Sequence, residues 1–265
     1  EAEGISLNFG SYFSSAQARR AVLGMADRPP GGEELERMKA LVRTAMEQGA
    51  LGMTSALIYP PSSFASTDEL VALGEVAAAY GGIYASHIRG EGKELVEAVE
   101  EAIEIGERAG MPVEIFHFKA AHEPGWGTLI REAAARIEAA RNRGVDVAAD
   151  QYPYTAGGTG LAATVPSWAF DGGADSLRAR LRRPEVRARM KEELETGYPG
   201  WWNIVEAAGG WDGIVLVNAR NRENARFEGM TLTEIAAARG QEPADAAWDL
   251  VLEGEGRVMA IYHMM

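Results

Sequence analysis

Residues 83–118 read IYASHIRGEGKELVEAVEEAIEIGERAGMPVEIFHF, and this stretch decides the fold class. It opens with a short β-rich run at 83–87. Residues 91–109 then predict a helix, because apolar side chains recur on one face: Leu95, Val99, Ala102 and Ile103. Gly110 ends that helix, and residues 113–118 form a second β-rich run. A strand, a helix and a strand in this order predict a βαβ unit with parallel strands.

The alternation of predicted strands and helices continues on both sides of this unit, with a period of about 30 residues. Further strands are expected at 5–9, 50–58 and 145–152, and further helices at 16–23, 33–48, 66–80 and 126–143. Consecutive strand–helix repeats predict an α/β fold whose parallel sheet is either doubly wound or closed as a (β/α)8 TIM-like barrel. No glycine-rich phosphate-binding sequence follows any of these strands, which disfavours nucleotide binding.

The regular alternation of predicted strands and helices ends after Tyr154. Residues 155–160 are rich in glycine and predict a flexible loop. A strand and two short helices follow, at 214–218, 231–238 and 244–252. We therefore predict a barrel portion at 1–154, a lid inserted over the barrel mouth at 155–255, and the start of the return to the barrel at 256–265.

Composition excludes several function classes. The chain has 265 residues, with 26 Lys plus Arg against 39 Asp plus Glu, so its formal charge of −13 argues against nucleic acid or an anionic membrane as a partner. It contains no cysteine, which excludes disulfides and thiolate metal ligands within it. The chain begins with Glu1 and ends in an apolar run at 258–265, so we expect an internal piece of a longer, cytoplasmic protein. Oligomeric state does not follow from the sequence.

Two histidines are candidate metal ligands. His87 and His117 each end a predicted strand and lie one βα unit apart. Neighbouring strands are less than about 5 Å apart, so two imidazoles at equivalent depth could share one ion. Imidazole suits Zn2+, which activates water and polarises a carbonyl. His122 is expected at the surface, and His263 lies in the final apolar run.

Charged residues next to these histidines have two interpretations. Lys119 follows His117 by two residues, which places both on one strand face. It could bind a substrate carboxylate, or it could form an ion pair with an acid such as Asp150. Arg89 and Glu91, which follow His87, have the same ambiguity.

Tyrosines near the strand ends are also candidates. Tyr152 and Tyr154 flank a proline, and Tyr59 precedes two prolines. Their hydroxyls could donate hydrogen bonds to a carbonyl or an oxyanion. Equally, the Tyr-Pro sequences could only shape the exits of the strands.

Four segments resemble the N-acyl-D-amino-acid deacylases (D-aminoacylases) of the amidohydrolase superfamily: LIYPP at 57–61, YASHIR at 84–89, VEIFHFKAA at 113–121 and DQYPYTAG at 150–157. The resemblance implies a metal-dependent-hydrolase (β/α)8 barrel, of which this chain would hold about strands three to seven and an inserted lid. It implies zinc ligands at His87 and His117, and substrate contacts at Lys119, Tyr152 and Tyr59. The implied substrate is a small molecule, an N-acyl-D-amino acid, hydrolysed by zinc-activated water to a carboxylate and a D-amino acid.

Parts of the family pattern have no counterpart in this chain. They are a strand-one His-x-His, a strand-two cysteine ligand and the strand-eight aspartate that acts as general base. We therefore expect the general base beyond Met265, and expect the 265 residues alone to be inactive.

Two other functions compete with this one. A hydantoinase- or dihydroorotase-like cyclic amidase would be favoured by a carboxylated bridging lysine, but no lysine ends the strand at 57–59. A non-catalytic, barrel-derived binding protein would be favoured if the chain were complete as given.

Overall fold

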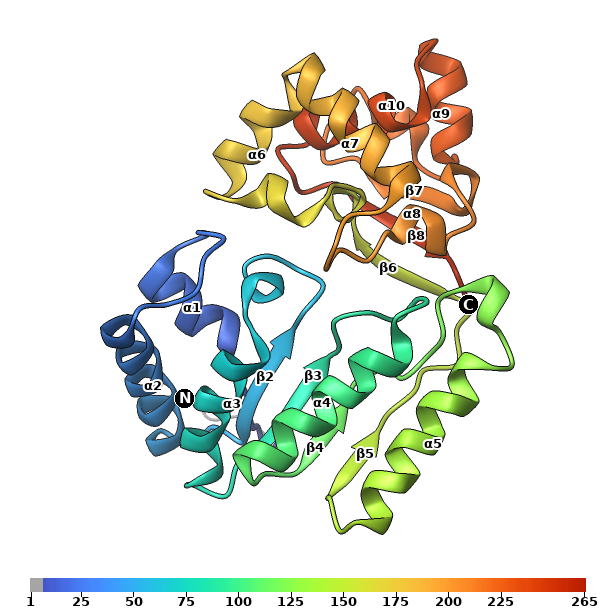
Figure 1. The fold of residues 1–265 in the computed structure, drawn as a ribbon. Helices are drawn as coiled ribbons and strands as arrows, with labels where there is room; N and C mark the ends of the chain where they lie inside the picture. The colour runs from blue at the N-terminus through green and yellow to red at the C-terminus, as the bar shows by residue number, and fades with distance from the viewer. Residues whose placement is uncertain (1–6) are drawn as a thin grey trace.

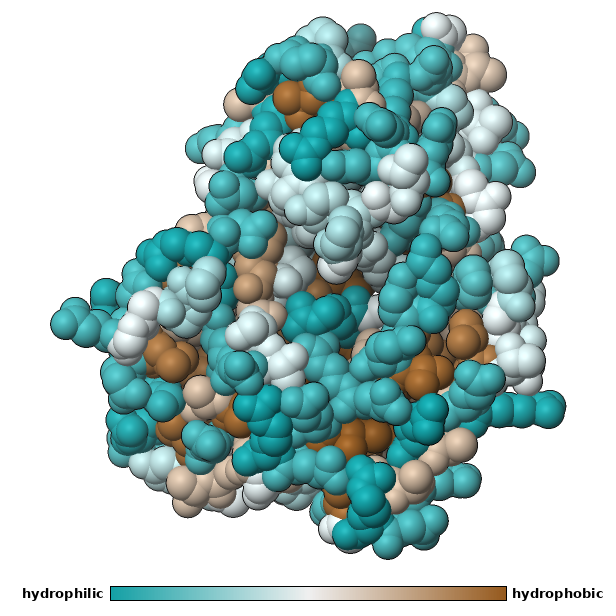
Figure 2. Space-filling model, in the orientation of Figure 1, coloured by the Kyte–Doolittle hydropathy of each residue, from teal (hydrophilic) through white to brown (hydrophobic). Residues whose placement is uncertain are grey.

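The computed structural model describes residues 7–265 as two lobes (Figure 1). The lower lobe contains a parallel sheet covered by helices, and the upper lobe contains a smaller antiparallel sheet with its own helices. The face drawn in Figure 2 is mainly hydrophilic, and its apolar residues lie in separate small patches. Within the described residues, no helix is both long and apolar enough to cross a membrane.

The lower lobe is built from alternating strands and helices. Its sheet has five strands in the order β1-β2-β3-β4-β5, all parallel: β1 (Phe13–Ser14), β2 (Gly52–Ala56), β3 (Ile83–His87), β4 (Val113–Ile115) and β5 (Val147–Ala149). The helices are α1 (Ser15–Leu23), α2 (Gly32–Glu47), α3 (Thr67–Ala78), α4 (Leu95–Ala109) and α5 (Leu129–Asn142). This confirms the α/β class and the sequential strand order of a (β/α) barrel, here present as an open five-stranded part.

The apolar face expected of α4 is the face that the helix buries. Leu95, Val99, Ala102 and Ile103 are all at most 4% exposed. Gly110 caps the helix in the left-handed conformation, at φ 71°. Helices α3, α4 and α5 contact β2, β4 and β5, respectively, so each crossover helix covers the sheet beside its own strands.

Several sequence-based boundaries are wrong; the strand expected at 113–118, for example, ends at Ile115. The strand expected at 5–9 falls in part on residues 1–6, which lie outside the described residues. Leu7 and Phe9 form no strand and are 77% and 82% exposed, because nothing packs against them; the first strand is β1 instead. Helix α4 begins at Leu95 rather than at 91, because residues 88–94, with two glycines, form a loop after β3.

The upper lobe has a three-stranded antiparallel sheet in the order β6-β8-β7: β6 (Ala156–Gly160), β7 (Ile214–Asn218) and β8 (Met259–His263). Its helices are α6 (Ala174–Leu181), α7 (Pro184–Thr196), α8 (Ile204–Ala207), α9 (Leu232–Arg239) and α10 (Pro243–Glu253). They pack around a separate core that includes Trp248 and Tyr262, both fully buried. The strand expected at 214–218 is confirmed, as are the two helices after it.

The flexible loop expected at 155–160 is wrong, because most of this stretch is β6. Its residues pair along β8, from Ala156 opposite His263 to Gly160 opposite Met259. Three glycines carry no side-chain pattern, so only the distant partner strand reveals the structure. Since β8 pairs with β6 and β7, residues 259–263 lie in the upper sheet; the domain boundaries at 154 and 255 stay predictions.

Candidate metal centre

The two histidines leave the sheet at different levels. Strand β3 ends at His87, whereas β4 ends at Ile115, two residues before His117. Ser86 pairs with Ile115, so the register makes His87 level with Phe116 and not with His117. The expected placement of the two imidazoles at equivalent depth is therefore wrong by one residue.

A left-handed residue compensates for this offset. In a fully extended β4, alternation would turn His117 to the opposite face of the sheet from His87. Instead His117 has φ 42°, a conformation uncommon outside glycine. The Asp150 carboxylate accepts a short hydrogen bond from the His117 N–H, and the Asp150 carbonyl accepts one from the N–H of Phe118 at 2.8 Å. Asp150 thus holds the turn that brings the two rings together.

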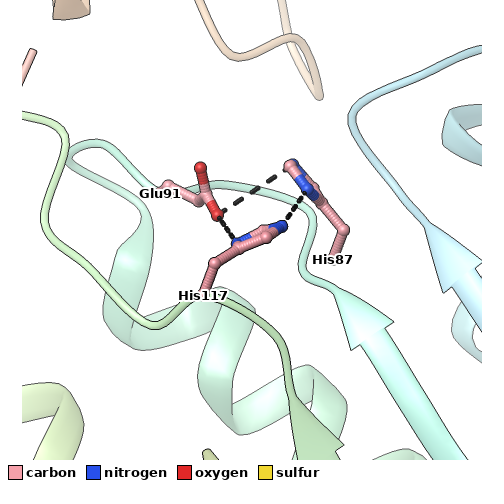
Figure 3. Close-up of side chains that lie close together, drawn as sticks. All are labelled: His87, Glu91 and His117. Carbon is pink, nitrogen blue, oxygen red and sulfur yellow. Dashed lines mark hydrogen bonds and ion pairs between the residues drawn. The ribbon is translucent and has the colours of Figure 1, made fainter. Parts of the chain in front are cut away.

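Three side chains meet at this point: His87, Glu91 and His117 (Figure 3). The distance from His87 Nδ1 to His117 Nε2 is 2.7 Å, and that from His117 Nδ1 to Glu91 Oε1 is 2.9 Å. One potential ligand atom from each residue lies within 4.8 Å of the others. We call these three residues the His–Glu–His cluster.

The protonation of the cluster suits a metal ion. Burial lowers the pKa of His87 to about 4, so its ring is neutral at neutral pH and offers a lone pair. Its buried Nε2 has no hydrogen-bond partner among residues 7–265, since Glu91 Oε1 is 4.0 Å away. Imidazole nitrogens are donors that zinc accepts, and a carboxylate beside them can bind the ion or orient a ligand ring. The residues present therefore fit a bound metal.

Glu91 is the member of the cluster that sequence reasoning left unassigned. It was expected at the start of the helix after His87, but it lies in the loop 88–94 and is 2% exposed. The spacing His-x-x-x-Glu was visible in the sequence. On a helix it would have indicated one shared face; in a loop it indicates nothing without the structure.

Lys119 is paired with Glu91 and not with Asp150. Its Nζ lies 2.5 Å from Glu91 Oε1 and 3.0 Å from His117 Nδ1, and its side chain is 10% exposed. The shared strand face inferred for Lys119 and His117 is wrong, because β4 has already ended. Its contact with a substrate carboxylate stays a prediction.

The predicted tyrosines border the same cavity, of about 340 Å³, as the cluster. Burial raises the pKa of Tyr152 to about 12, so its hydroxyl is protonated. Tyr59 hydrogen-bonds Thr159 of the upper lobe at 2.8 Å, and Ile204 and Met264 of that lobe also line the cavity. Each lobe therefore contributes walls to it.

The remaining candidates lie outside the cluster. Arg89 forms a two-pronged ion pair with Glu101, at 2.8 Å on each side, and donates to the carbonyls of Ser63 and Ala65. These contacts favour the ion-pair interpretation of Arg89. His122 is half-buried in the loop after β4, and His263 lies on β8; neither belongs to the cluster.

Known proteins resemble this chain in sequence and in fold. No protein-family model matches it. The D-aminoacylase of Alcaligenes xylosoxydans xylosoxydans is 38% identical over 156 residues, which are 59% of this chain and 32% of that protein. The N-acyl-D-glutamate deacylase of the same organism is 36% identical over 161 residues, covering 60% and 32%.

Solved structures that resemble this chain are also of N-acyl-D-amino-acid deacylases. The N-acyl-D-glutamate deacylase of Bordetella bronchiseptica, complexed with zinc and a phosphonate mimic of the tetrahedral intermediate, gives a TM-score of 0.74 at 27% identity, covering 100% of this chain and 45% of that one. A D-aminoacylase crystal structure gives 0.66 at 29% identity, covering 94% and 42%. The chain spans about a third of the length of the curated relatives it matches.

Fold and site together define part of a barrel-type α/β protein with a candidate metal centre beside the carboxyl ends of its strands. Within that class, the chain is related over part of its length to the N-acyl-D-amino-acid deacylases, as its four sequence segments predict.

Removing either histidine of the cluster should weaken metal binding. We expect His87→Ala and His117→Ala each to lower Zn2+ affinity at least about tenfold, because each substitution removes an imidazole nitrogen ligand. Isothermal titration of the metal-free chain measures this. The matched control is His122→Ala, which should bind like the wild type; equal losses in all three variants would contradict the assignment.

The left-handed turn at His117 should also be needed for zinc binding. Asp150→Ala removes the acceptor for the His117 N–H, and we expect roughly tenfold weaker Zn2+ binding. Asp150→Asn keeps an acceptor oxygen and should restore most of the affinity. Asp146, exposed just before β5, provides the control: if Asp146→Ala weakens binding as much, the effect does not come from the turn.

Proposed function

We propose that this chain forms the metal-binding part of a zinc-dependent N-acyl-D-amino-acid deacylase, with zinc held by His87 and His117. The observation that carries the proposal is the His–Glu–His cluster, in which Glu91 is buried and the two histidines are partly exposed; it lies beside the ends of parallel strands and borders a cavity of about 340 Å³. Two curated relatives are named for the deacylation of D-amino acids or N-acyl-D-glutamate, and a solved one was captured with zinc.

Zinc in this position would supply a Lewis acid and an activated water for attack on an amide carbonyl. The chain's own residues would bind and orient the substrate. Lys119 is a cation in the cavity wall. Its ammonium group is paired with Glu91 and can donate a further hydrogen bond to a substrate carboxylate. The protonated hydroxyls of Tyr59 and Tyr152 can donate to the acyl carbonyl. We assign no general base among residues 7–265.

The upper lobe serves as a lid in this proposal. Strands β2 and β3 point toward it (Figure 1), and Thr159, Ile204 and Met264 from that lobe complete the cavity around the cluster. A lid that excludes bulk water would strengthen the electrostatic interactions inside the cavity. Residues 155–255 are the proposed extent of this lid, and residues 1–154 that of the barrel portion.

Stereoselective hydrolysis tests the function. The protein, expressed from its complete gene and loaded with zinc, should hydrolyse N-acetyl-D-methionine with a kcat/KM roughly 100-fold or more above that for the L-isomer, because the site binds one hand of the substrate. Release of the free amino acid measures the rate. Activity should fall sharply in His117→Ala and persist in His122→Ala.

Two results would contradict the proposal. Preference for the L-isomer would remove the D-specific assignment. Hydrolysis of a hydantoin or dihydroorotate, with none of the linear amide, would place the protein among the cyclic amidases instead.

A further inference from the structure

We propose that Glu91 is a positioning residue: its carboxylate accepts the Nδ1 proton of His117 and thereby leaves His117 Nε2 as the nitrogen that binds the metal. The inference rests on the proposed function, since it takes His87 and His117 as the ligands. It assigns Glu91 to the histidine ring rather than to the metal.

The distances favour this assignment. Glu91 Oε1 lies 2.9 Å from His117 Nδ1, which is hydrogen-bond length, and 4.0 Å from His87 Nε2. A neutral imidazole has one donor and one acceptor nitrogen. If His117 Nδ1 donates to Glu91, Nε2 keeps its lone pair, and Nε2 is the nitrogen that faces the His87 ring at 2.7 Å. Metal-bound histidines commonly donate their other nitrogen to a carboxylate, which fixes the tautomer and raises the basicity of the ligand.

Glu91 Oε1 is already occupied as an acceptor. It takes a hydrogen bond from Lys119 at 2.5 Å in addition to the one from His117. One carboxylate oxygen has about two lone-pair positions, so these two donors use the acceptor capacity of Oε1. The Glu91 carbonyl also accepts from the N–H of Ala121 at 2.7 Å, which ties the loop 88–94 to the segment after His117.

The buried carboxylate of Glu91 is paired with the ammonium group of Lys119, at 2.5 Å. Lys119 balances its charge, so the buried pair is neutral overall. A carboxylate paired in this way can only accept hydrogen bonds, so a hydrogen bond between Glu91 and His117 requires the proton on Nδ1 of His117.

The opposite arrangement is specific enough to be tested. Lys119 Nζ lies 3.0 Å from His117 Nδ1 and would donate to that nitrogen if it carried no proton. His117 would then be the Nε2–H tautomer, and Glu91 would hold only Lys119. The tautomer of His117 therefore distinguishes a positioning role from a simple ion pair.

Nitrogen-15 NMR of the metal-free, histidine-labelled chain reads the tautomer directly, with His117→Ala assigning the signals. We expect the His117 ring to carry its proton on Nδ1. An Nε2–H tautomer would overturn the proposal, and this readout does not depend on whether the protein is a deacylase.

Zinc titration of two substitutions separates positioning from ligation. Glu91→Gln keeps an oxygen that can accept from His117 Nδ1, so we expect Zn2+ affinity within a few-fold of the wild type, whereas Glu91→Ala should lose about 10- to 100-fold. Equal large losses in both variants, with both still folded by circular dichroism, would make Glu91 a ligand and overturn the proposal. No loss in either would also overturn it.

Glu94→Ala is the matched control, since that glutamate lies three residues along the chain, is 48% exposed and should not change binding. If His87 and His117 do not bind zinc at all, His87→Ala will bind zinc as well as the wild type does. That result would contradict the proposed zinc site and is distinguishable from a failure of the role proposed for Glu91.

Discussion

The site depends on the left-handed backbone of one residue, His117. Because β3 and β4 are offset by one residue at their ends, regular extension would place the two imidazoles on opposite faces of the sheet. The left-handed conformation of a non-glycine residue costs about 1–2 kcal/mol, and the hydrogen bonds to Asp150 offset this cost. Backbone strain at a residue of a partly buried polar cluster is typical of a functional site.

The second lobe reinforces the arrangement from above. Gly92 lies next to Glu91 in the loop 88–94, and a Cβ at that position would come within 2.6 Å of the Trp202 indole nitrogen. The loop that carries the buried carboxylate is therefore packed against the lobe that lines the cavity. Tyr59 makes a second connection through its hydrogen bond to Thr159. The loop 88–94 and Tyr59 on the lower lobe are thus connected to the upper lobe by direct contacts.

The features that could be predicted from the sequence are those that depend on local residue patterns. The period of strands and helices predicts the parallel sheet, and the apolar stripe of α4 predicts its buried face. The position of two histidines at strand ends predicts their meeting. Sequence did not reveal Glu91 as the third member, because a loop has no periodicity, nor β6, because its glycines carry no pattern and its partner β8 lies about a hundred residues away. The offset at His117 depends on register, which only the paired strands define.

Anomalous X-ray diffraction at the zinc absorption edge, from crystals of the zinc-loaded chain, tests most directly whether His87 and His117 bind one zinc ion together. We expect one anomalous peak about 2.0–2.1 Å from a nitrogen of His87 and from Nε2 of His117, with Glu91 still hydrogen-bonded to Nδ1 of His117. A peak held by His122 or by surface carboxylates, with none at the His–Glu–His cluster, would contradict it.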